Sequence, residues 1–270
     1  MSEISDRFRR DGAVVLRNLL TPLQVATLRE GIDDNLAHPS SAAKTASRAD
    51  DPGQFVEDFC NWQRNPHYRE VIFNSQVPAA AAELMASQVV RFHHDHMLTK
   101  EAGTVQRTPW HQDQPYYNIE GRDTISFWIP VDPVPREATL EFVAGSHLGP
   151  WLMPRSFMAH EAKWFPEGSL ADLPDIEADR TAHDILGWAL QPGDAVAFHM
   201  LTLHSSGGSA TRRRVFSARF VGDDARHAPR PWTTSPAFPG LADRLPAGTP
   251  FDDPLFPVVY GDDDMRVAQA

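Results

Sequence analysis

Short runs rich in β-branched and aromatic residues, separated by turn residues, follow one another after residue 88. They span residues 89–92, 125–131, 139–143, 195–204 and 215–221. Runs of this length, with turn residues between them, are typical of strands in antiparallel barrels and sandwiches. We therefore predict a mainly β fold with a double-stranded β-helix core, of the jelly-roll or cupin-like kind, and helices packed on its outside.

The first third of the chain carries helix signals. Thr21 is a suitable N-cap, Pro22 suits the first helical position, and Gln24 completes a capping box. Residues 78–87 are rich in Ala, Glu, Leu and Met, which favour helices. We expect a helical N-terminal third over about residues 1–88.

The remaining boundaries follow from composition. We expect a single domain over residues 1–270, with its jelly-roll core at about 89–222. Residues 151–186 show little periodicity and are predicted to be a loop insert. The proline-rich residues 223–270 are predicted to wrap the mouth of the barrel as loops.

Composition excludes several classes of protein. Cys60 is the single cysteine, so no internal disulfide can form, and no apolar secretory signal follows Met1; we expect a cytoplasmic protein. No apolar run approaches the roughly 18 residues that span a bilayer, so we expect no membrane association. The net charge of -11 disfavours nucleic acid as a partner. The oligomeric state cannot be predicted.

Two potential metal ligands lie two residues apart. His111 and Asp113 are separated by Gln112, and residues i and i+2 of an extended strand point to the same face. An imidazole and a carboxylate can therefore converge on one ion. Alone, this triplet is weak evidence, because most such triplets bind nothing. Gln112 and Gln114 are candidates for hydrogen bonds that orient the imidazoles.

A third candidate ligand lies far along the chain. Residues 193–204 read as a turn that leads into a strand, and this strand ends at His204. Two histidines and one carboxylate, with three adjacent coordination positions open, form the set that suits ferrous iron in oxygen activation. We therefore predict that His111, Asp113 and His204 bind Fe(II).

An arginine is predicted beside these ligands. If Gly208 and Ser209 form a tight turn, counting outward places His204 opposite Arg213, with Ser206 on the same face. A guanidinium there can hold the distal carboxylate of a dicarboxylate whose other end chelates the ion. If the register slips by one residue, Arg212 or Arg214 takes this role.

Other histidines and one further arginine have plainer interpretations. We expect His93, His94 and His96 to be structural rather than metal ligands, because successive strand residues alternate faces. His199 is expected to pack within the fold. Arg219 is predicted to face inward, either as a second anion contact or as an internal ion-pair partner.

These motifs together resemble the phytanoyl-CoA dioxygenase family of iron(II) and 2-oxoglutarate oxygenases. The likeness extends from about Gly12 to Phe220, and its distal histidine and arginine make it specific. The motifs that carry it are, in order, His111-Gln112-Asp113, Trp128, Val143-Ala144-Gly145-Ser146-His147, Pro192-Gly193-Asp194, His204, Ser206 and Arg213.

The resemblance implies a cofactor set and a reaction. His111, Asp113 and His204 would bind Fe(II), and Arg213 with Ser206 would hold the distal carboxylate of 2-oxoglutarate. The reaction would consume O2, convert 2-oxoglutarate to succinate and CO2, and hydroxylate a small molecule. The carboxylate of Asp113 favours hydroxylation over halogenation, because halogenating relatives lack it. Met97 and Trp128 match positions that line the cosubstrate pocket, and are expected to do so here.

The sequence also departs from the pattern of the family. Residues 138–141 replace the usual Asn-Gly, and Ala144 stands where proline is common. These departures leave the substrate open, including whether it is a CoA thioester. Two alternatives remain: a non-catalytic metal-binding jelly-roll protein, and a metal cupin enzyme that needs no 2-oxoglutarate.

Overall fold

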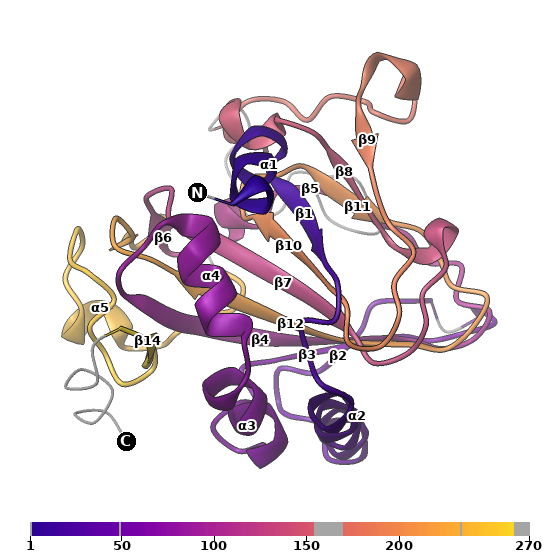
Figure 1. Cartoon of the computed structure of the whole chain (residues 1–270), viewed down its shortest axis with the longest axis horizontal. Coiled ribbons are helices and arrows are strands. Elements are labelled where there is room, and N and C mark those ends of the chain that lie inside the picture. The colour runs from indigo at the N-terminus through magenta and orange to yellow at the C-terminus, as the bar shows by residue number, and fades with distance from the viewer. Residues whose placement is uncertain (1, 49, 154–169, 233, 262–270) are drawn as a thin grey trace.

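Two antiparallel sheets face each other in the computed structural model, which describes residues 2–48, 50–153, 170–232 and 234–261 (Figure 1). The strand order of the larger sheet is β1 (Ala13–Leu16), β10 (Ala195–His199), β7 (Thr124–Pro130), β12 (Arg213–Val221), β4 (Val90–Lys100), β3 (Phe55–Phe59) and β2 (Lys44–Thr45), and β14 (Val258–Tyr260) also pairs with β4. The order of the smaller sheet is β5 (Thr108–His111), β11 (His204–Ser206), β8 (Leu140–Val143) and β9 (Ile185–Leu186). A two-stranded sheet joins β13 (Arg226–His227) and β6 (Ile119–Glu120).

Helices cover the outer face of the larger sheet. They are α1 (Glu3–Asp11), α2 (Pro22–Ala37), α3 (Pro66–Asn74) and α4 (Val77–Met85), with the short α5 (Leu241–Arg244) near the C-terminus. The capping box predicted at Thr21 is present at the start of α2. Figure 1 shows α2 and α3 on the side of the larger sheet away from β5, β8 and β11.

The strand β12 shows how the layers are built. Phe216, Ala218 and Phe220 belong to the apolar core shared with α2, α3 and α4. Their neighbours Arg213, Ser217 and Arg219 line the pocket between the sheets instead. Period-two alternation therefore directs apolar residues to the helices and polar residues to the interior pocket.

Two strand predictions need correction. The run predicted as one strand over residues 195–204 forms two strands in different sheets, because the chain turns between His199 and His204. The predicted strand at residues 89–92 extends to Lys100, and its register shifts where Arg219 and Phe220 pair with His94 and Phe92. This shift leaves His93 as an extra residue, which is the arrangement of a β-bulge.

The predicted hairpin between His204 and Arg213 is wrong. The strand β11 pairs with β5 and β8, while β12 pairs with β4 and β7. The intervening segment crosses between the sheets and binds another loop: the N–H of Ser209 donates to the carbonyl of Thr104, and the N–H of Gly103 donates to that of Ser209. At Gly208 a side chain would meet the backbone of Thr104, so this close approach requires glycine.

The predicted boundary near residue 88 falls between α4 and β4, but the N-terminal third is not helical throughout. It also supplies β1, β2 and β3 to the larger sheet. Within the predicted insert, residues 154–169 lie outside the described residues, as do 233 and 262–270 of the predicted C-terminal wrap. The division into one domain stays a prediction. No helix among the described residues is long and apolar enough to cross a membrane.

Candidate metal centre

The two imidazoles lie on neighbouring strands of the smaller sheet. His204 on β11 is the direct cross-strand partner of His111 on β5, and their ring centroids are 4.2 Å apart. Nδ1 of His111 lies 2.8 Å from the carbonyl of Pro109, and Nδ1 of His204 lies 2.9 Å from that of Thr202. A carbonyl only accepts, so each Nδ1 carries a proton, which leaves Nε2 as the atom that can bind a metal.

Asp113 reaches the same point from a turn rather than from a strand. The strand β5 ends at His111, and Asp113 has helical backbone angles at the start of a short 3-10 helix (Gln114–Tyr116). The N–H groups of Asp113 and Gln114 both donate to the carbonyl of Met200, which fixes this turn. The strand geometry predicted for the His111–Asp113 pair is therefore wrong, although the two side chains do converge.

One carboxylate oxygen of Asp113 faces both imidazoles. Oδ1 lies 3.6 Å from Nε2 of His111 and 3.7 Å from Nε2 of His204. One ligand atom from each of the three residues lies within 4.8 Å of the other two. This donor set, two imidazoles and one carboxylate, fits a ferrous ion with open coordination positions.

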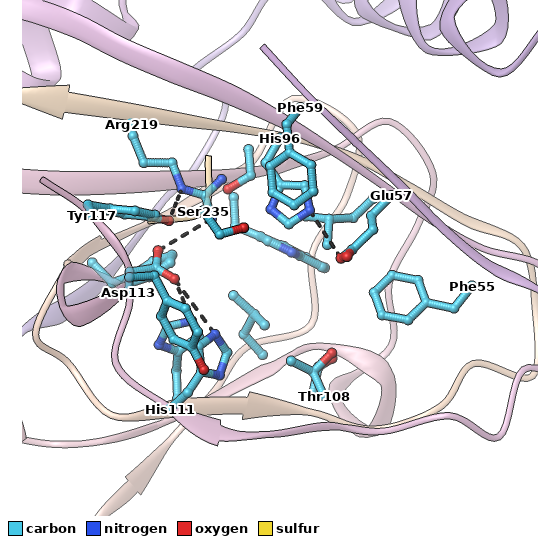
Figure 2. A pocket seen from close by; sticks show the side chains of 18 of the residues that line it. Phe55, Glu57, Phe59, His96, Thr108, His111, Asp113, Tyr117, Arg219 and Ser235 are labelled. Atoms are coloured by element: carbon cyan, nitrogen blue, oxygen red, sulfur yellow. Dashed lines mark hydrogen bonds and ion pairs between the residues drawn. The ribbon is translucent and has the colours of Figure 1, made fainter. Parts of the chain in front are cut away.

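The other oxygen of Asp113 is held by the protein. Oδ2 accepts a hydrogen bond of 2.9 Å from Ser126. It also lies 3.3 Å from Nη2 of Arg219 (Figure 2). Burial acts to raise the pKa of Asp113, but Arg219 and the two imidazoles together lower it well below its usual range. The carboxylate is thus charged and oriented. Burial also lowers the pKa of His204 to about 3, with His111 as the next cause, which keeps its imidazole neutral.

The contacts of Arg219 decide between the two roles predicted for it, a second anion contact or an internal ion-pair partner. Its Nε donates to the hydroxyl of Tyr117 at 3.2 Å, and Nη2 pairs with Asp113. It is therefore an internal ion-pair partner, although its Nη1 has no hydrogen-bond partner in the described part of the chain. Sequence patterns did not identify Ser126, because contacts between distant segments leave no local signal.

A second group of pocket residues lies mainly on the larger sheet. We call it the carboxylate pole, and we call the three ligand residues the metal pole. Arg213, Ser206 and Trp128 line the same pocket as the three ligand residues. The guanidinium of Arg213 lies 5.4 Å from the centre of the Trp128 ring and donates to the carbonyl of Ala138. No carboxylate lies within ion-pair distance of it among the described residues, and burial lowers its pKa to about 10. Within that part of the chain, Arg213 is a buried cation without an anion.

The neighbouring arginines are occupied elsewhere. Arg214 pairs with Asp132 at 2.7 Å and with Asp33 at 2.8 Å, and Arg212 pairs with Glu101 at 3.0 Å. Arg213 is therefore the member of the triplet that faces the pocket, although the hairpin used to predict it does not exist. Arg213 reaches the site because the larger sheet, which carries it, faces the smaller sheet, which carries the two histidines.

Met97 does not lie where it was predicted. It is buried in the apolar core among the helices, and the pocket is lined by its neighbours His96 and Leu98. Alternation along β4 accounts for this, because Met97 pairs with Phe216, which faces the same helices. The assignment of Met97 to the cosubstrate pocket is therefore wrong.

The predicted glutamine contacts to the imidazoles are also absent among the described residues. Gln112 binds the backbone of Leu201, Pro150 and Leu152, while Gln114 binds Thr124 and nearby carbonyls. Backbone carbonyls orient the imidazoles instead.

Four other histidines are structural or line the pocket. His93 and His94 are buried and hydrogen-bonded to each other at 2.7 Å, which the bulge in β4 permits. His199 bonds the carbonyl of Arg122. His96 stacks on Phe59 and lies 3.3 Å from Glu57 at the pocket wall (Figure 2). Sequence reasoning did not identify this pair.

The fold and the site define a class of protein: a jelly roll whose two sheets enclose a two-histidine, one-carboxylate centre and a buried arginine. Comparison with known families makes this specific. The family described as Phytanoyl-CoA dioxygenase (PhyH) matches residues 8–215, and the chain belongs to this family. Its cofactors are iron(II) and 2-oxoglutarate, with O2 as the oxidant.

Individual relatives agree with this assignment. A probable phytanoyl-CoA dioxygenase of Caenorhabditis elegans is 30% identical over 122 residues, which cover 44% of this chain and 37% of that protein. The chain thus matches little more than a third of the length of that curated relative.

Solved structures confirm the jelly-roll fold. The epimerase SnoN of nogalamycin biosynthesis, in complex with Fe3+, alpha ketoglutarate and nogalamycin RO, is similar with a TM-score of 0.75, 23% identity and coverage of 95% of this chain and 97% of SnoN. The carbocyclase SnoK of the same pathway has a TM-score of 0.73, 22% identity and 96% coverage of both chains. EctD from S. alaskensis has a TM-score of 0.67, 18% identity, and coverage of 89% of this chain and 82% of EctD.

Proposed function

We propose that this protein hydroxylates a small molecule, with conversion of 2-oxoglutarate and O2 to succinate and CO2. The observation that carries the proposal is one pocket with two poles. His111, Asp113 and His204 form one pole, and the carboxylate-free cation Arg213 forms the other. An α-keto acid with a distal carboxylate is the ligand that satisfies both poles.

Each residue has a definite task in this proposal. His111 and His204 present their Nε2 atoms to the iron, and Asp113 presents Oδ1. Arg213 and Ser206 hold the distal carboxylate, with Trp128 against the guanidinium. When bound, the iron supplies the oxygen-activating chemistry. The residues orient both substrates and exclude water, and Asp113 keeps its charge because Arg219 and Ser126 hold it.

The rest of the pocket wall is available to the molecule that is oxidised. Phe55, Phe59 and Tyr116 supply apolar surface there, and Glu57 with His96 supplies polar groups (Figure 2). This mixed wall fits a small organic substrate. We place the protein in the cytoplasm and expect neither nucleic acid nor membrane as a partner, because of its single cysteine and net charge of -11.

The reaction type is the part that experiment must decide, because SnoN is an epimerase and SnoK a carbocyclase. A metabolite screen should score consumption of 2-oxoglutarate by the iron-loaded protein in air. The reaction with each active compound is then repeated under ¹⁸O2. Hydroxylation adds one labelled oxygen to the product.

Other outcomes are distinguishable in the same samples. An epimerised product keeps the mass of its substrate, and a cyclised product loses two hydrogens. Either result would overturn the hydroxylase assignment while leaving the cofactor assignment intact. The Asp113→Ala variant is the control, because any product it forms does not arise at the proposed iron site.

A further inference from the structure

A lysine lies beside Arg213 at the carboxylate pole and has no acidic partner in the part of the chain that the structure describes. Lys100 on β4 is 1% exposed and is the cross-strand partner of Arg213 on β12. Its Nζ lies 2.7 Å from the carbonyls of Gln106 and Gly207, and 3.4 Å from Oγ of Ser206. A buried lysine is ordinarily paired with an acid.

The charged surroundings of Lys100 are all cationic at close range. Arg213 faces it from β12, and Arg107 approaches from the segment before β5. From β3 it meets the ring of Phe55, whose centre lies 4.7 Å from Nζ. No carboxylate lies within 4 Å of Nζ among the described residues, and the adjacent Glu101 pairs with Arg212 at 3.0 Å.

These surroundings disfavour the charged form of the lysine. Burial first, then Arg213 and Arg107, lower the pKa of Lys100 to about 6. Near neutral pH the empty pocket therefore holds a neutral amine, which has two hydrogens and one lone pair. The two carbonyls accept both hydrogens, and the lone pair is then left to accept the hydroxyl hydrogen of Ser206, whose Oγ lies 3.4 Å away.

We propose that Lys100 is a second cation for the distal carboxylate of 2-oxoglutarate, that it acts through Ser206, and that it takes up one proton from solvent when this carboxylate binds. This rests on the proposed function, which places the carboxylate against Arg213 and Ser206. As an ammonium group, Lys100 has three hydrogens, for the same two carbonyls and for Oγ of Ser206. The hydroxyl hydrogen of Ser206 is then free to donate to the carboxylate.

Linkage gives this proposal a definite pH dependence. At a pH above the pKa of Lys100 in the empty pocket, each 2-oxoglutarate that binds must be accompanied by one proton. The dissociation constant of 2-oxoglutarate therefore rises by about tenfold per pH unit, until the pH reaches the pKa of Lys100 in the occupied pocket. Below about pH 6 the lysine is already protonated, and this dependence vanishes.

The test is anaerobic calorimetry of the iron-loaded protein with 2-oxoglutarate at pH 7.5, in two buffers of different ionisation enthalpy. The difference in heat gives the number of protons taken up, and we expect about one for the wild type. Lys100→Met should take up about one proton fewer. Its dissociation constant should be raised at least about tenfold at pH 7 and should be nearly independent of pH.

Two variants provide controls. Arg107→Gln removes the other nearby cation, whose side chain is largely exposed, and should retain the proton uptake. Lys100→Gln replaces Lys100→Met if the latter does not fold.

The outcomes separate this proposal from the one it rests on. Wild-type binding without proton uptake, or uptake that persists without Lys100, would overturn the role of the lysine only. Absence of 2-oxoglutarate binding by the iron-loaded wild type would overturn the proposed function, and the role of Lys100 with it.

Discussion

The two poles of the pocket differ in how their charge is balanced. At the metal pole, Asp113 is compensated within the protein by Arg219 and Ser126. At the carboxylate pole, the partners of Arg213 and Lys100 among the described residues are carbonyls, a hydroxyl and aromatic rings, with no carboxylate. The charge of Asp113 at the metal pole is thus balanced by protein groups, whereas the described residues of the carboxylate pole carry an excess of positive charge.

This difference indicates which of the two poles selects the cosubstrate. A metal centre of two histidines and one carboxylate accepts many chelating ligands. A buried cationic end, by contrast, is satisfied only by a ligand that carries an anion at the right distance. We therefore propose that Arg213 and Lys100 of the larger sheet provide the specificity. The proposed metal ligands come from the smaller sheet, at His111 and His204, and from the turn that holds Asp113.

The largest effect should come from Asp113→Ala. It removes an iron ligand and also leaves Arg219 as a buried cation without its carboxylate. We expect iron affinity to fall by at least about a hundredfold, and the free energy of unfolding to fall by about 3–5 kcal/mol. Competition with a chelator and urea denaturation measure the two effects. Unchanged stability would contradict the ion pair with Arg219.

A smaller effect, confined to the other pole, is expected for Arg213→Gln. We predict that the binding free energy of 2-oxoglutarate becomes less favourable by about 2–4 kcal/mol, so that its dissociation constant rises about 30-fold to 1,000-fold. Iron affinity should be unchanged. Anaerobic calorimetry measures the first quantity. Arg212→Gln is the matched control, because Arg212 pairs with Glu101 instead of facing the pocket. Equal losses in both variants would refute the assignment of Arg213.

Ser126→Ala should weaken the metal pole without removing a ligand. The hydroxyl of Ser126 donates to Oδ2 of Asp113 at 2.9 Å, so its loss frees that carboxylate to rotate. We expect iron affinity to fall by about tenfold. The affinity for 2-oxoglutarate of the fully iron-loaded variant should stay within about twofold of wild type. Ser217→Ala is a control at the same pocket.

The smallest effect is predicted for Met97→Leu. Because Met97 packs among the helices, we expect a change in unfolding free energy of less than about 1.5 kcal/mol and no change in 2-oxoglutarate affinity. Denaturation and calorimetry measure these. A clear loss of 2-oxoglutarate affinity would restore Met97 to the cosubstrate pocket.

Local patterns predicted more of the strands than of their pairing. The runs that became β7, β8 and β12 were predicted within one or two residues, because alternation and turn residues are local. The pairing of β11 with β5 was not predicted, because a tight turn after His204 competes with a crossing to Thr104 that only the folded chain reveals.

For the site too, the sequence predicted the main residues but not their tertiary partners. His111, Asp113, His204 and Arg213 were predicted from spacing and resemblance, and the structure brings all four to one pocket. The partners of these residues escaped prediction. Ser126 and Lys100 come from strands whose alignment with the site depends on tertiary register, so nothing in the local sequence marks them.

The central claim is that both poles bind one molecule of 2-oxoglutarate for reaction with O2. The most direct test is formation of succinate from 2-oxoglutarate by the iron-loaded protein in air, compared with Asp113→Ala and Arg213→Ala. Anaerobic binding of 2-oxoglutarate should be measured in parallel. We predict slow succinate formation without added substrate, and its loss in both variants. Equal succinate formation by the variants, or no binding of 2-oxoglutarate by the wild type, would contradict the claim.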